Sequence, residues 1–319
     1  MPKLGCATKT IVFSLVIILA FFAVGFIFGP LGSSFFGIEV PSFMNVSKPH
    51  VALPSEGLFE VAGFSVTNTL IASWLTVIVL VVVFFVCTRR MKPIPGRLQN
   101  LAEMAVEALL GFVKSVAGEK HARLLFPAVA TIFIYVITNA YLALLPFFGT
   151  ITYKIVVAGQ EVAVPLFRSA NTDINVPLSI ALVSFVFIEF WGMKSLGASH
   201  YLGGFFNFGQ LGRGVKELFK GKIRPAITSI AFGFINLFVG MLEVFSHLIR
   251  VMSFTFRLFG NMTAGEILLL VSAFLIPFIF TIPFYGLELL IGFIQALIFA
   301  GLTLVFGTIA VAPMHEEQE

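Results

Sequence analysis

Charged residues are scarce in this chain. They make up 11% of its 319 residues, whereas 58% are hydrophobic; a soluble globular domain carries roughly 25% charged residues. A soluble protein of this length could not cover its surface with so few polar side chains. Lipid removes the difficulty, because an apolar surface then faces hydrocarbon. The composition therefore predicts a polytopic integral membrane protein.

Cysteine and histidine are also rare, and their positions exclude several kinds of site. The two cysteines, Cys6 and Cys87, lie far apart and have no metal-binding spacing. His247 is the one histidine inside a long apolar run, so we expect no zinc, no haem and no other metal or cofactor. A redox membrane subunit, which needs paired histidines on facing helices, is disfavoured for the same reason.

The basic residues explain the net charge of +4 without a nucleic-acid partner. They lie mostly between apolar runs, where Lys and Arg set orientation in a membrane. With the N-terminus placed inside, fifteen fall in inside regions and only Lys48, Lys154 and Arg168 fall outside. The remaining two are Arg250 and Arg257. We therefore expect both termini to be cytoplasmic.

Apolar runs mark the expected membrane segments, since a spanning helix needs about 20 residues. They are Ile11–Phe28, Val66–Cys87, Leu124–Phe147, Val176–Met193, Ala226–Ile249, Met252–Ile282 and Phe284–Ala312. No Gly or Pro lies between residues 241 and 259, so the helix there should continue through Arg250. Pro277 and Pro283 are interpreted as kinks in a second long helix. Residues 226–312 are thus predicted to form two long, tilted helices.

The remaining segments suggest a division of the chain. The first apolar run could be an uncleaved signal anchor or a secretory signal; no clean small-x-small cleavage site stands out after Phe28, which favours an additional helix. We expect residues 1–64 to hold this segment and an extracytoplasmic loop, and residues 65–319 to form the membrane domain. A basic, Gly-rich cytoplasmic loop is expected at about 195–225. Segment Leu98–Gly118 mixes acidic and apolar residues, which predicts an amphipathic helix at the cytoplasmic surface.

Ionisable residues inside apolar runs gather in the last third of the chain. Each costs about 2.5–3.5 kcal/mol at the centre of a spanning helix and therefore needs a partner or a function. They are Glu243, His247, Arg250, Arg257, Glu266 and Glu288, accompanied by polar Asn261 and Gln295. At about 100° per residue, the members from Glu243 to Asn261 fall in a stripe roughly 80° wide. Glu266 follows Arg257 by nine residues, which places it about 13.5 Å farther along and on the opposite face.

Simpler structural roles compete with functional ones at several of these positions. Glu243 and Arg250 could form an ion pair across two turns, and His247 is more typical of a helix-packing residue than of a ligand. Glu189 is expected to reach the aqueous boundary near a helix end. Arg257 is different, because it stays charged at any accessible pH and no acid lies one turn away. It calls for a carboxylate from another element or another chain.

The run SFTFRLFGNMTAGE, Ser253–Glu266, closely resembles a motif of the ATP synthase subunit a family, in which R-L-F-G-N-M-x-A-G-E marks the penultimate membrane helix. Segment 95–107 resembles the family's interfacial helix, and RSANTDIN at 168–175 its periplasmic turn. FIQA at 293–296 resembles its last helix. Departures are Val251, where a proline is common, and Ala170-Asn171, where Pro-Thr is common.

The resemblance implies an all-α fold with five membrane helices, an interfacial amphipathic helix and, here, the additional N-terminal hydrophobic helix. It implies a stator subunit without catalytic activity of its own, in which two proton half-channels meet a rotating ring of c subunits. Arg257 matches the arginine that faces the ring. The expected proton-path residues are Asn261, Glu266, Glu288 and Gln295, with Glu243 on the cytoplasmic side and Asn139, Arg168, Asp173 and Asn175 at the periplasmic entrance.

The implied partners are the c-ring, the b subunits of the peripheral stalk, the remainder of the ATP synthase complex, and membrane lipid. The N-terminal segment favours the plasma membrane of a bacterium over an organellar membrane, and the proton is favoured over sodium as the transported ion. A coupled secondary transporter is the main alternative, but it usually shows internal repeats, and none is evident here. A purely structural scaffold would not explain Arg257.

Overall fold

The computed structural model describes residues 6–37, 54–157, 160–197, 223–277 and 279–311, and a few residues between 198 and 222. The expected cytoplasmic loop at about 195–225 falls largely outside the described residues, as do both chain ends.

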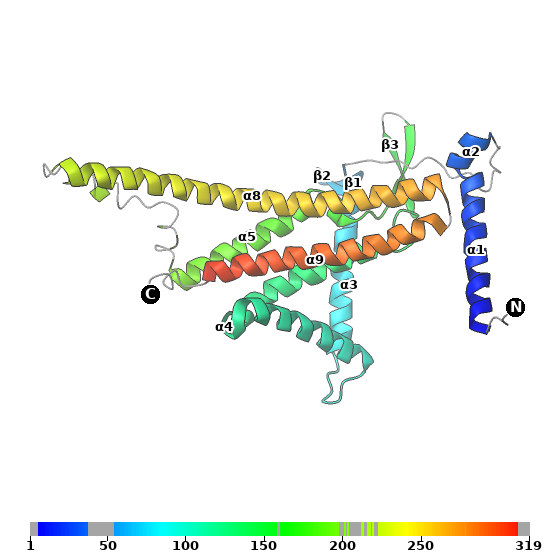
Figure 1. Ribbon diagram of the computed structural model, residues 1–319, viewed down its shortest axis with the longest axis horizontal. Helices are drawn as coiled ribbons and strands as arrows, with labels where there is room; N and C mark the ends of the chain where they lie inside the picture. Colours follow the sequence, from blue (N-terminus) through cyan, green and yellow to red (C-terminus); the bar gives the residue numbers. More distant parts are fainter. Residues whose placement is uncertain are drawn as a thin grey trace. The chain divides into compact units, whose positions relative to one another are not determined.

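Six helices in the described ranges are long and apolar enough to cross a membrane (Figure 1). They are α1 (Cys6–Phe28), α3 (Asn68–Thr88), α4 (Arg97–Ala143), α5 (Asn175–Leu196), α8 (Ile223–Leu275) and α9 (Ile282–Val311). Shorter helical pieces are α2 (Pro30–Phe36), η2 (Ala170–Thr172) and η3 (Ile279–Thr281). The predicted helical class and the additional N-terminal helix are confirmed.

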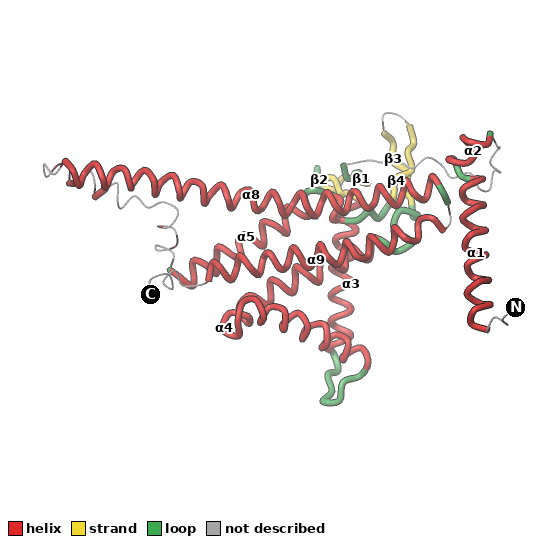
Figure 2. Tube along the Cα trace, viewed as in Figure 1, coloured by secondary structure: helices red, strands yellow, loops and turns green. Residues whose placement is uncertain are grey.

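Two short antiparallel hairpins, which the sequence analysis did not predict, lie in the connections before α3 and α5 (Figure 2). The first pairs β1 (Gly57–Val61) with β2 (Phe64–Thr67), and the second pairs β3 (Thr152–Val157) with β4 (Gln160–Pro165). Ala62 and Gly63 connect the first two strands with φ of 51° and 82°. Two positive φ values are what a tight hairpin turn requires.

Helix α4 consists of two helices that meet at Gly118, where φ is 72° and ψ is 164°. The first part matches the amphipathic helix predicted for Leu98–Gly118, and the second part is the spanning segment. Only glycine adopts this backbone conformation readily. The break therefore lets the chain change direction between the two helices without a loop.

Replacing Gly118 with alanine should lower the thermal midpoint of the detergent-solubilised complex. A side chain at these angles costs about 1–3 kcal/mol, and the added Cβ would meet nothing within 4 Å, so backbone strain is the sole cause. Gly111→Ala is the matched control, because it lies inside the same helix with equal space and should be neutral or stabilising. Equal midpoints for the two variants would contradict this account.

Helices α8 and α9 are the two long helices expected at the C-terminal end. The 53 residues of α8 extend for about 80 Å at 1.5 Å per residue. A hydrocarbon core is about 30 Å thick, so α8 must be strongly tilted or extend beyond the membrane. The interpretation of the two prolines is wrong: Pro277 lies in the interruption between α8 and α9, and Pro283 is the second residue of α9, where its missing N–H costs no hydrogen bond.

The chain packs as two compact units. The first comprises residues 1–76, 137–173 and 259–294. In it the ring centroids of Phe22 on α1 and Phe280 on η3 lie 6.1 Å apart. A Cβ on Gly29 would lie 2.7 Å from the Leu275 carbonyl oxygen, so glycine permits this close approach.

The second unit comprises residues 77–136, 174–258 and 295–319. Its core contains Phe254 of α8, whose ring centroid lies 4.9 Å from that of Phe299 on α9. A hydrogen bond of 2.8 Å between the hydroxyls of Ser184 and Thr303 joins α5 to α9. Aromatic packing and a satisfied polar pair therefore hold the three helices together.

Candidate functional site

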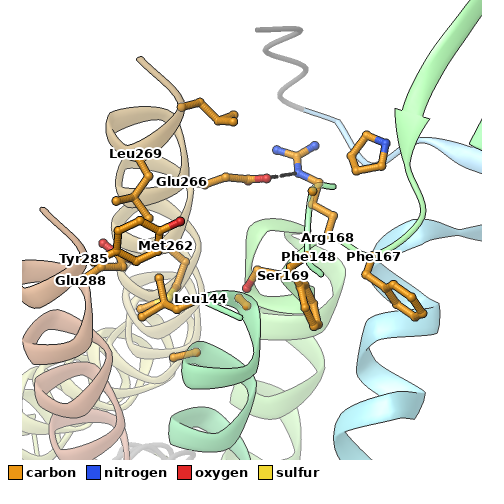
Figure 3. Close-up of a pocket in the computed structure, with 15 residues that line it drawn as sticks. Leu144, Phe148, Phe167, Arg168, Ser169, Met262, Glu266, Leu269, Tyr285 and Glu288 are labelled. Atoms are coloured by element: carbon orange, nitrogen blue, oxygen red, sulfur yellow. Dashed lines mark hydrogen bonds and ion pairs between the residues drawn. The ribbon is translucent and has the colours of Figure 1, made fainter. Parts of the chain in front are cut away.

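A cavity of about 120 Å³ lies in the first unit, walled by the end of α4, the segment after β4, α8 and α9. Most of its lining is apolar. The polar exceptions are Arg168, Ser169, Glu266, Tyr285 and Glu288, and Figure 3 shows the Arg168 side chain extending toward Glu266. Three of the residues predicted for the proton path therefore line one cavity.

Arg168 and Glu266 form a charge-assisted pair at the wall of this cavity. The guanidinium Nε lies 3.1 Å and 3.0 Å from the two carboxylate oxygens, and Nη1 donates to the Pro54 carbonyl oxygen at 3.1 Å. Arg168 is 6% exposed and Glu266 is 27% exposed. Removing one partner of such a pair costs about 3–5 kcal/mol, because the other charge is left uncompensated. Each side chain therefore fixes the position of the other.

Glu288 lies against the backbone of α8 at Gly265. The residue is buried, and a Cβ built on Gly265 would overlap the Glu288 carboxylate. Glycine at this position is therefore what admits the carboxylate from α9. Gly292 of α9 admits Ala140 of α4 in the same way, because the Ala140 Cβ would lie 3.0 Å from a Cβ added at Gly292.

Asn139 and Asp173 lie in a buried polar network of the same unit. The Asn139 amide donates to the Thr76 hydroxyl at 2.9 Å, and the Ser169 hydroxyl donates to the Asn139 oxygen at 3.4 Å. Asp173 accepts from the Thr69 hydroxyl at 2.9 Å. The hydroxyl residues were not predicted as site residues.

Arg257 lies on α8 in the second unit and is half-buried. Its Nη2 donates to the Ser253 hydroxyl, one turn earlier, at 3.3 Å. Among the residues that the structure describes, no carboxylate lies within ion-pair distance of Arg257. The acidic partner expected for Arg257 is therefore not found among the described residues.

The other predicted residues are not brought into the cavity. Asn261 is exposed on α8, one turn beyond Arg257. In the second unit Glu243 is exposed on α8, Gln295 is buried on α9, and Asn175 is exposed as the first residue of α5. Within the described ranges, no three His, Cys, Asp or Glu side chains are grouped as metal ligands would be.

Comparison with known proteins agrees with the motif. The family described as ATP synthase A chain matches residues 70–308. The chain is 31% identical over 233 residues to ATP synthase subunit a of Campylobacter jejuni subsp. jejuni serotype O:23/36 (strain 81-176), covering 73% of this chain and 84% of that protein. It is 31% identical over 234 residues to ATP synthase subunit a 3 of Pelobacter propionicus, covering 73% and 83%. For ATP synthase subunit a of Trichlorobacter lovleyi the identity is 27% over 239 residues, covering 75% and 85%. This chain belongs to the ATP synthase subunit a family.

Proposed function

We propose that protons enter this subunit through the cavity lined by Arg168, Glu266 and Glu288 and are passed to a rotating ring that Arg257 faces. Family membership makes the chain a multi-pass membrane protein, the stator subunit of the ATP synthase membrane sector that translocates protons. To this family role we add the residues of this chain that carry the proton.

The pair of buried Arg168 and partly buried Glu266, in the cavity that Glu288 also lines, carries the proposal. Carboxylates inside a membrane protein are costly and mark ion or proton pathways. Here two of them line one cavity, and a single cation, Arg168, is paired with Glu266. We propose that the proton passes between the Glu266 and Glu288 carboxylates within this cavity. The network of Asn139 and Asp173 supplies the polar entrance to the same unit.

Arg257 is proposed to face a carboxylate of the rotor. At 4 Å and an effective dielectric of 20, a guanidinium attracts a carboxylate by about 4 kcal/mol, and its fixed charge repels protons that would leak straight across. The residues that share this helix face with Arg257 are exposed in the isolated chain: Ser253, Gly260, Asn261 and Ala264. Small residues around one charge let a partner helix approach closely within lipid.

The proposed arrangement has cytoplasmic termini, following the distribution of Lys and Arg. The proton leaves on the cytoplasmic side near Glu243, with Gln295 and Asn175 as further polar residues of the path. The proposed partners are the c-ring and the b subunits of the peripheral stalk, in the plasma membrane of a bacterium. The proposed division is a segment 1–64 preceding the membrane domain 65–319.

The test is ATP-driven proton pumping in inverted vesicles that carry the assembled complex, with wild type beside Glu266→Gln. A positioned proton-transfer group contributes about 10²–10⁴-fold, so pumping per assembled complex should fall at least about tenfold. Glu60→Gln is the matched control, since Glu60 is exposed on β1 and should be silent.

The pumping assay is read together with the amount of assembled complex. Normal pumping by Glu266→Gln at normal assembly would refute the cavity as the proton entrance. Equal losses in Glu266→Gln and Glu60→Gln would mean that the assay reports assembly and not proton transfer.

A further inference from the structure

A second cluster of polar side chains lies in the second unit, on α5, α8 and the residues that follow α5. The Nδ1 atom of His247 lies 2.7 Å from Oε1 of Glu189. The Tyr201 hydroxyl donates to the other carboxylate oxygen, Oε2, at 2.9 Å. The His247 and Glu189 side chains are 13% and 17% exposed. We call these three residues the Glu189 cluster.

The cluster bears on two interpretations of the sequence. Glu189 does not extend freely from a helix end but turns toward α8, seven residues before α5 ends at Leu196. His247 does pack between helices, with its ring edge-to-face with Phe185 at 5.8 Å between centroids. His247 also contacts the Glu189 carboxylate, and a histidine that only packs between helices does not need such a contact. A carboxylate and an imidazole are thus held together inside a membrane protein.

The surrounding residues hold this geometry in place. A Cβ on Gly192, one turn beyond Glu189, would lie 2.8 Å from the Tyr201 ring, so glycine makes room for the tyrosine. Burial, together with the hydrogen bond to Glu189, raises the pKa of Tyr201. Its hydroxyl therefore keeps its proton and serves as a fixed donor.

The charged neighbours of the cluster come from α8. Glu243 lies one turn before His247 on that helix, and Arg250 lies one turn after it. The guanidinium of Arg250 stacks on the Phe306 ring of α9, 3.6 Å from its centroid. The sequence allowed an ion pair between Glu243 and Arg250. Among the described contacts, Arg250 instead makes a cation–π contact. From α5, the group that faces His247 is Glu189 itself.

Imidazole is the side chain best suited to take up and release protons near neutral pH. Its two nitrogens allow it to accept a proton on one side and give one up on the other. A carboxylate within 3 Å is a suitable acceptor, provided that its other oxygen is held still. The Glu189 cluster has each of these parts.

We propose that His247 and Glu189 carry protons on the cytoplasmic side of the path, next to Glu243. A proton arriving from the rotor carboxylate binds the imidazole, and the Nδ1 proton passes to Oε1 of Glu189. This leaves the imidazole neutral with its remaining proton on Nε2, and tautomer exchange of that proton to Nδ1 restores the starting form. The carboxylic proton is released to cytoplasmic water, which restores the carboxylate. Tyr201 holds Oε2 and so keeps Oε1 toward His247. This inference rests on the proposed function and extends its exit side.

The experiment measures passive proton conduction through the membrane sector in inverted vesicles stripped of the catalytic head, between pH 5 and 8. The variants are His247→Gln and Glu189→Gln, normalised to assembled complex. In each variant, conduction should fall roughly tenfold. Its dependence on pH should also lose the part that an imidazole produces. The double variant should be no slower than the slower single variant, because both groups serve one step.

Controls separate transfer from structure. His121→Gln, a histidine of α4 outside the cluster, should conduct normally. Tyr201→Phe should lower conduction less than Glu189→Gln and leave the shape of the pH profile unchanged. A structural cluster would instead reduce assembly and leave conduction per assembled complex and its pH profile at the wild-type values, which would overturn the inference.

Glu266→Gln, run in parallel, distinguishes the two proposals. If it blocks conduction while His247→Gln conducts like wild type with the same pH profile, the exit inference fails alone. If Glu266→Gln conducts normally, the proposed entrance fails, whatever the exit variants do.

Discussion

Replacing Arg257 with alanine should abolish ATP-driven proton pumping while the complex still assembles. The substitution removes the guanidinium that we propose attracts a rotor carboxylate, an attraction worth about 4 kcal/mol at 4 Å. A loss of that size corresponds to more than about a hundredfold in rate. Assembly should survive, because the one described polar contact of Arg257 is the bond to Ser253 on its own helix.

A conservative exchange at the same position sharpens the test. Arg257→Lys keeps a cation, but lysine loses its proton readily when buried and lacks the planar fork of donors. It should pump far less than wild type and show passive leak. Arg90→Ala is the control, since Arg90 is exposed just after α3. Pumping by Arg257→Ala at the wild-type rate would make the residue a structural cation and reopen the secondary-transporter alternative.

Gly265→Ala is expected to have the second-largest effect, although it adds a single methyl group. The new Cβ would overlap the Glu288 carboxylate, so either Glu288 must leave its place or α8 and α9 must separate. The displaced acid would no longer lie in the cavity beside Glu266. Pumping in inverted vesicles should therefore fall at least about tenfold, the contribution of a misplaced proton-transfer group.

Gly286→Ala is the control for this prediction. Gly286 lies on α9, two residues before Glu288, and an added Cβ would meet nothing within 4 Å. Alanine is the better helix former by about 0.5–1 kcal/mol, so this variant should pump normally. If Gly265→Ala also pumps normally, the position of Glu288 in the cavity is not needed for proton entry.

The spanning helices were predictable because hydrophobic length is a local property of the chain. The end of the predicted amphipathic helix at Gly118 could also be predicted from the local sequence. The turn at Ala62-Gly63 lacks the Asn-Gly or Asp-Gly pair that usually announces a tight hairpin, so the first hairpin was missed. Pro277 was misjudged because a proline can kink a helix or end it, and the surrounding apolar run is the same in both cases.

The sequence predicted which residues belong to the site but not which of them contact one another. Arg168 and Glu266 are 98 residues apart, and no helical or strand period relates them. The same holds for Glu189 and His247, whose contact depends on how α5 packs against α8. A motif can identify residues of a path, whereas the identity of each partner is a property of the folded chain.

Helix α8 has no interruption between Arg257 and Glu266. The number of residues between these two positions is therefore as constrained as the residue types themselves. One inserted residue would turn everything beyond it by about 100° and shift it by 1.5 Å. Glu266 would then swing away from Arg168, although no side chain had been substituted. Insertions and deletions between Arg257 and Glu266 should therefore abolish the coupling of proton flow to rotation, even at positions where a single substitution is tolerated.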